Sequence, residues 1–126
     1  MLSTIINSSL MWITFSIYSD LNFVGIQFTK PTIDISQMTN FHIDVNIQAP
    51  NPIDGEDYLK IQLVDIGPDN TFGTSDDSSG EIALTSPTLL NGSWVSIDLP
   101  LSSLSGLTSK ANLAQVVFIS DATITD

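Results

Sequence analysis

The chain contains no cysteine and no arginine, and it has only three lysines and one histidine. Without cysteine there is no disulfide, no thiolate metal site and no cysteine nucleophile. Fourteen acidic residues leave a formal net charge of -11. Nucleic-acid binding needs cationic side chains that displace counterions from phosphate, so nucleic acids are excluded as partners. Anionic membranes and acidic polysaccharides are disfavoured for the same reason, unless a bound cation bridges them, which leaves neutral ligands and cations.

Long apolar runs are also missing, and none approaches the length of a membrane-spanning helix. The stretch from residue 1 to 20 is apolar but has no basic region at its start, so it is a poor signal peptide. No segment carries a helical stripe of apolar residues, and residues 101–109 could form one helical turn at most. A chain of 126 residues that is 42% hydrophobic is expected to form a single domain, residues 1–126.

What the sequence does have is alternation of apolar and polar residues, the pattern of half-buried strands. In "FHIDVNI", for example, Phe41 and Ile43 face one way while His42 and Asp44 face the other. Turn-forming sequences separate the runs. The run at 114–120 is apolar on both faces, as in a central strand. The predicted strands cover residues 10–18, 23–29, 41–47, 58–65, 93–99 and 114–120, with short additional candidates at 33–36 and 81–85. This pattern predicts an all-β antiparallel β-sandwich.

Three successive blocks, "IDISQMTNFHIDVNI", "LKIQLVDIGPDNTFGTSDD" and "NGSWVSIDLPLSSLSGLTSKANLAQVVFIS", suggest a family. Over residues 18–126 the chain resembles the β-sandwich carbohydrate-binding modules of the galactose-binding-like, jelly-roll type. Close relatives of these modules are appended to secreted polysaccharide hydrolases, such as laminarinase-type glycoside hydrolases of marine bacteria. The resemblance implies a non-catalytic module that binds a neutral polysaccharide such as a β-glucan, in an extracellular or cell-surface location.

Two departures from that family concern the ends of the chain. Such modules continue into a last strand of the kind "VYVDNIYF" where this sequence ends, and residues 1–17 do not match the usual opening strand. A missing strand would leave an open sheet edge and uncover apolar side chains of residues 114–120. The run from Leu10 to Tyr18 could fill that place in its own chain or pair with a second copy, and the sequence slightly favours the homodimer. A structural or adhesion module that assembles through this edge is the alternative function.

Five acidic residues lie in the stretch from residue 65 to 81, which contains no lysine or arginine. Calcium binds six to eight oxygens held on a flexible turn, and Gly67 and Gly73 allow tight bends here. The spacing does not match the EF-hand loop, and a solvated acidic turn is the alternative. Similar "GPDG-x-x-G-x-x-DD" loops of secreted bacterial proteins resemble calcium binders. The candidate ligands are Asp65, Asp69, Asp76, Asp77 and Glu81, with Asn70 and Thr71 as further donors.

Four aromatic residues are candidates for binding a sugar, which stacks its apolar face on an aromatic ring. Strand parity places Trp94, Trp12 and Tyr18 on polar faces, and Tyr58 opens a strand near an acidic loop. The alternative for Trp94 is a mostly buried side chain that caps the edge of the sandwich.

The single histidine does not point to catalysis. His42 lies in the middle of a predicted strand, and no G-x-S-x-G motif accompanies it. Paired carboxylates could in principle hydrolyse a glycoside, but a glycosidase cleft is normally built on a larger scaffold. We therefore expect a protein without enzymatic activity.

Overall fold

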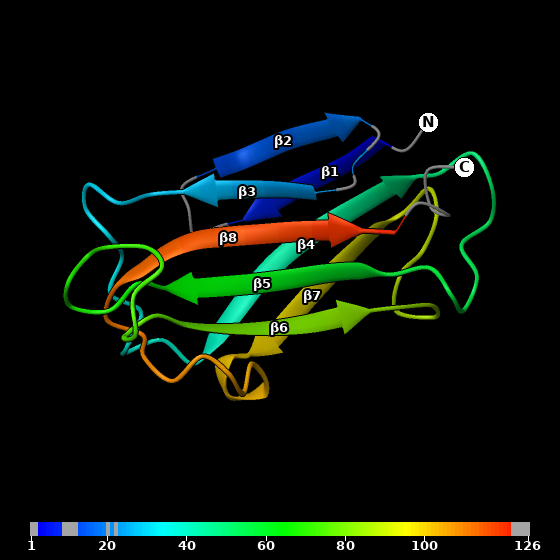
Figure 1. Ribbon diagram of the computed structural model, residues 1–126. Helices are drawn as coiled ribbons and strands as arrows, with labels where there is room; N and C mark the ends of the chain where they lie inside the picture. Colours follow the sequence, from blue (N-terminus) through cyan, green and yellow to red (C-terminus); the bar gives the residue numbers. More distant parts are fainter. Residues whose placement is uncertain (1–2, 9–12, 20, 22, 122–126) are drawn as a thin grey trace.

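The computed structural model describes residues 3–8, 13–19, 21 and 23–121. Eight strands form two four-stranded antiparallel sheets, and no α-helix occurs among the described residues. The predicted all-β antiparallel sandwich is therefore confirmed (Figure 1). The strands are β1 Ser3–Ser8, β2 Ile13–Ser19, β3 Phe23–Gln27, β4 Asn40–Gln48, β5 Leu59–Asp65, β6 Ser78–Leu84, β7 Trp94–Pro100 and β8 Leu113–Ser120.

Sheet A has the strand order β2-β1-β4-β7, and sheet B has the order β3-β8-β5-β6. Apolar side chains of both sheets form one buried cluster between them, including Ile43 and Ile97 from sheet A and Ile61 and Phe118 from sheet B. Because side chains alternate along each strand, the polar residues between these apolar ones face outward. The burial pattern of β5 shows this alternation directly, with a buried residue at every second position from Leu59.

Strand β8 is central, as its two apolar faces predict. It pairs with β3 on one side and with β5 on the other, and Val117 on its outer face is buried as well. The expectation that residues 114–120 would be uncovered by a missing neighbour is therefore wrong for the described strands. The sequence could not show this, because which strands flank β8 depends on pairings between distant segments.

The N-terminal region forms a hairpin within its own chain. Strand β1 pairs with β4, and β2 pairs with β1, so β2 is an edge strand of sheet A. The sequence predicted a strand at 10–18 but none at 3–8, where "STIINS" has no clear alternation. A second difference lies at 33–36, where the structure has only an isolated bridge from Ile33 to Leu113 in place of a strand. The single helical turn expected within 101–109 is a 3-10 turn, η1 Leu101–Ser103.

The segment after η1 packs against the first residues of the edge strand β6. A β-carbon at Gly80 would lie 2.7 Å from the Leu104 carbonyl oxygen, and one at Gly106 would clash with the Ser79 carbonyl oxygen. Both glycines are therefore required for this close approach. Ser109 adds a hydrogen bond from its backbone N–H to Ser78 Oγ at 3.2 Å. The start of this edge strand is therefore covered, and Glu81 places a charge further along it.

Candidate functional site

The loop of residues 66–77, which joins β5 to β6, gathers three carboxylates. Asp69, Asp76 and Asp77 each offer an oxygen, and these oxygens all lie within 4.8 Å of one another. Two oxygens bound to one calcium ion at 2.3–2.6 Å can be up to about 5 Å apart. The three side chains therefore fit around a single cation. We call them the aspartate cluster.

Local hydrogen bonds fix the shape of this loop. Thr74 Oγ1 donates to Asp76 Oδ1 at 2.6 Å and lies 3.2 Å from Asp77 Oδ1. The backbone N–H of Gly73 donates to Asp77 Oδ2 at 2.7 Å, and that of Thr71 donates to Asp69 Oδ1 at 2.9 Å. Such bonds from an aspartate to nearby backbone N–H groups are typical of tight turns. They hold the three carboxylates near one another.

Thr74 also affects the ionisation of the cluster. The hydroxyl of Thr74 donates to the Asp76 carboxylate and lowers the pKa of Asp76 below its usual value. A carboxyl group whose pKa is lowered by folding stabilises the folded state above its unfolded pKa, and this contribution is lost as pH falls through the folded pKa. Asp76 therefore stays ionised, and able to bind a cation, further into the acidic range than an ordinary aspartate.

The other two candidate ligands have different partners. Asp65 has an exposed fraction of 0%, and its two carboxylate oxygens accept hydrogen bonds from the backbone N–H groups of Gly67 and Asn112 at 2.8 and 2.7 Å. Glu81 lies on β6 with its carboxylate 3.9 Å from Lys60 Nζ. The structure therefore brings together three of the five predicted ligands, and Asp65 joins the base of the loop to the start of β8.

The outward-facing side of β4 and β7 is the second candidate site. The outward side chains of β4, and those of β7 from Trp94 to Asp98, are all polar or aromatic. None of them is a lysine or arginine. We call this surface the β4–β7 face. Its members are Asn40, His42, Asp44, Asn46, Gln48, Trp94, Ser96 and Asp98.

Trp94 stands at one end of the β4–β7 face. It is directly opposite Asn46 in the register of the two strands, and 51% of it is exposed. The alternative of a mostly buried tryptophan at the sandwich edge is therefore not what the structure has. The exposed indole offers an apolar stacking surface for a sugar, and the exposed hydroxyl of Ser96 offers a hydrogen-bonding partner, while Asn46 itself is buried.

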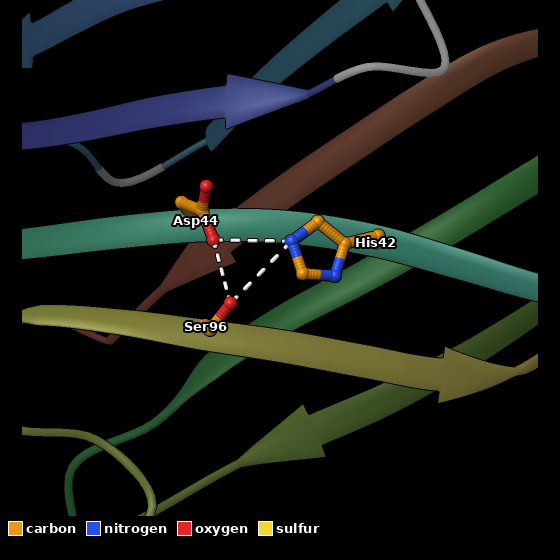
Figure 2. A network of polar contacts seen from close by, with 3 residues as sticks. All are labelled: His42, Asp44 and Ser96. Carbon is orange, nitrogen blue, oxygen red and sulfur yellow. Dashed lines mark hydrogen bonds and ion pairs between the residues drawn. The ribbon is translucent and has the colours of Figure 1, made fainter.

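The centre of the same face holds three connected polar side chains (Figure 2). Ser96 Oγ donates to Asp44 Oδ1 at 2.8 Å, while His42 Nε2 lies 3.1 Å from Asp44 Oδ1 and 3.4 Å from Ser96 Oγ. A catalytic triad places serine and aspartate at opposite ring nitrogens of the histidine. Here both neighbours face the same nitrogen, and Ser96 is bonded directly to Asp44. This trio is therefore arranged as a polar surface patch and lacks the proton-relay geometry of a triad.

Two of the remaining aromatic candidates, Tyr58 and Tyr18, lie away from the β4–β7 face. Tyr58 is half-buried and lies under Lys60, whose Nζ is 4.9 Å from the ring centroid. Tyr58 and Lys60 lie on the outer side of sheet B, across the core from the β4–β7 face. Tyr18 lies on β2 opposite Thr4, and Thr4 lies opposite the core residue Ile47 of β4. The register therefore places the Tyr18 position on the core side of sheet A, and the predicted outward position is wrong. Trp12 lies outside the described residues.

Three polar residues of the site were not named as binding candidates from the sequence. Asn46, Ser96 and Asp98 share the outward parity of their strands, which is the only signal that the sequence offers for them. Thr74 was not identified as important for the loop from the sequence either, because its hydrogen bonds to two aspartates form only in the folded loop. Pairing of β4 with β7 is what turns separate polar residues into one surface.

Comparison with known proteins found no matching protein-family model, curated protein or solved structure. The described part of the chain also contains no helix with the length and apolar character needed to cross a membrane.

Proposed function

We propose that the chain is a non-catalytic carbohydrate-binding module that binds a neutral polysaccharide on the β4–β7 face. The observation that carries this proposal is the exposed Trp94, which stands beside two paired strands of outward polar side chains without a lysine or arginine. A pyranose ring would stack on the indole of Trp94. The exposed hydroxyl of Ser96 would then exchange hydrogen bonds with the sugar's hydroxyl groups, whereas Asn46, which is only 9% exposed, accepts a hydrogen bond from Gln48 Nε2.

The charge of the surface supports a neutral ligand. Asp44 and Asp98 are the carboxylates of the β4–β7 face, and the whole chain has a net charge of -11. An acidic polysaccharide would be repelled by both. A β-glucan has no charge and carries the ring faces and hydroxyl groups that this surface can contact. An extracellular role beside a secreted glycoside hydrolase is part of the same proposal and derives from the sequence resemblance.

Replacement of Trp94 by alanine tests the sugar-binding proposal. We expect the wild type to bind soluble β-glucan oligosaccharides and Trp94→Ala to bind them about tenfold more weakly or worse, because the stacking surface is gone; a tenfold loss corresponds to about 1.4 kcal/mol. Isothermal titration calorimetry would measure both affinities. Phe72→Ala is the matched control, since Phe72 is also an exposed aromatic side chain but lies on the β5–β6 loop.

The control should bind like the wild type. A wild type that binds no neutral glycan in a panel, or a Trp94→Ala variant with unchanged affinity, would contradict the proposal. Circular dichroism of each variant separates lost binding from lost folding.

We further propose that the aspartate cluster binds calcium and thereby fixes the β5–β6 loop. The three carboxylates fit one cation, and the loop's carbonyl oxygens and solvent would complete the six to eight ligands that calcium takes. The ion would supply a structural cross-link. The ion would contribute no chemistry to sugar binding, because the aspartate cluster lies on the loop between two strands of sheet B, whereas the β4–β7 face belongs to sheet A.

Calcium is expected to raise the melting temperature, and EDTA to lower it. A ligand that binds only the folded state at about 100 times its Kd stabilises that state by roughly 2.7 kcal/mol. The double variant Asp76→Asn with Asp77→Asn should lose the shift, whereas Glu81→Gln, outside the cluster, should keep it. Thermal unfolding followed by circular dichroism would show the shifts. An unchanged melting temperature at millimolar calcium would reduce the loop to a solvated turn.

A further inference from the structure

The free edge of β3 differs from the opposite edge of the same sheet. Strand β6 carries Glu81, and its first residues pack against the segment around Gly106, whereas β3 pairs with β8 alone among the described strands. In Figure 1, β3 lies at the upper border of sheet B with its outer side unpaired by any strand of that sheet. The five residues of β3, "FVGIQ", include no charge and no proline. Natural edge strands usually carry one of these protections against pairing with other chains.

The register of β3 shows which of its backbone groups are free. Residues of an antiparallel pair alternate between those that hydrogen-bond the partner strand and those that point away from it. The N–H of Phe28 donates to the Ala114 carbonyl oxygen at 2.8 Å, so Ile26 and Val24, two and four positions earlier, also face β8. The N–H and C=O groups of Phe23, Gly25 and Gln27 therefore point away from β8.

These three outward-pointing residues are self-complementary. If a second β3 lies antiparallel about a two-fold axis at Gly25, then Gly25 faces its own copy and Phe23 faces Gln27 of the other chain. All three residues are then at hydrogen-bonded positions on both chains. At the centre, Gly25 presents no side chain, and the amide of Gln115 and the ring of Phe23 from its own chain lie beside it.

Charge also favours this edge as a contact between copies. Two chains with a net charge of -11 repel each other, so a stable contact must use a surface without acidic side chains. Strand β3 is such a surface. Phe23, which is 63% exposed, would cover the glycine pair of the joined strands, as aromatic side chains commonly do beside glycine on a sheet.

We propose that β3 is a homodimerisation strand, which joins the B sheets of two copies into one continuous antiparallel sheet about a two-fold axis at Gly25. The occupant of the edge is a second copy of this chain. This inference is independent of the proposed sugar binding. Neither β4 nor β7 takes part in the contact, so a dimer would present two β4–β7 faces and gain avidity for a polymer that reaches both.

Amide hydrogen exchange tests this pairing at single-residue resolution. We expect the hydrogen-exchange rates of the Gly25 and Gln27 amides to fall by about tenfold or more as protein concentration is raised, since dimers form by mass action. The amides of Val24 and Ile26, which face β8, should be protected at every concentration and serve as internal controls. Sedimentation should show a monomer–dimer equilibrium over the same range.

Two variants of Gln27 isolate the role of the backbone. Gln27→Pro removes an outward N–H without removing a bond to β8, because proline is tolerated where an edge strand faces solvent. It should abolish the dimer, while Gln27→Ala, which keeps the N–H, should still dimerise. If Gln27→Pro fails to fold, the exchange experiment on the wild type decides alone. Free exchange at Gly25 and Gln27 at all concentrations, concentration-independent protection in a monomer, or a dimer that leaves these amides unprotected would overturn the proposal.

Discussion

Replacing Phe118 by alanine is expected to lower the free energy of unfolding by about 3–5 kcal/mol, the usual cost of removing a buried phenylalanine side chain. Phe118 lies on the central strand β8, where it is 1% exposed and lies opposite Val24 on one neighbour and Ile61 on the other. The ring fills space between the two sheets, and the surrounding strands cannot close the cavity without breaking their pairing. Much of the stability of an ordinary domain would be lost.

Phe23→Ala is the matched control for this experiment, because the chemical change is the same and Phe23 is 63% exposed on β3. We expect its effect to stay within about 0.5 kcal/mol, the range for surface substitutions. Urea unfolding at a concentration where the chain is monomeric would measure both variants. Equal losses for the two variants would show that the described core is wrong.

Asp65→Ala is expected to lower the free energy of unfolding by about 2–4 kcal/mol, which is the second-largest effect that we predict. Its side chain is fully buried and accepts hydrogen bonds from the backbone N–H groups of Gly67 and Asn112. Alanine would leave both donors without a partner, at a cost of about 1–3 kcal/mol for each buried group. The connection between the start of the β5–β6 loop and the start of β8 would also be lost.

The same variant distinguishes a structural role from metal binding. If Asp65 stabilises the fold only through its two backbone partners, Asp65→Ala should lower stability equally with and without calcium. Asp98→Ala, an exposed aspartate on β7, should have little effect in either condition. Urea unfolding with calcium and with EDTA would measure the three proteins. A loss for Asp65→Ala that occurs only with calcium would make Asp65 a metal ligand.

The candidate site could be predicted only in part from the sequence. The outward position of Trp94 follows from strand parity, which holds wherever one face of a sheet is buried. For the acidic stretch, composition pointed to the loop where three carboxylates lie together, but it could not separate Asp65 from Asp76. Both are aspartates beside a turn, and only the folded chain buries the first against Asn112 and leaves the second in the loop.

By itself, the sequence determined that the chain is all-β and which residues of most strands face the core. These properties depend on the local alternation of apolar and polar residues, which can be seen directly in the sequence. The tertiary structure alone decided that β1 pairs with β4, that β8 lies between β3 and β5, and that β3 has no second partner among the described strands. The physical reason is that strand pairing joins distant segments through backbone groups that are the same in every residue except proline. Side-chain patterns therefore mark the strands, while their neighbours are selected by how the two sheets pack around one core.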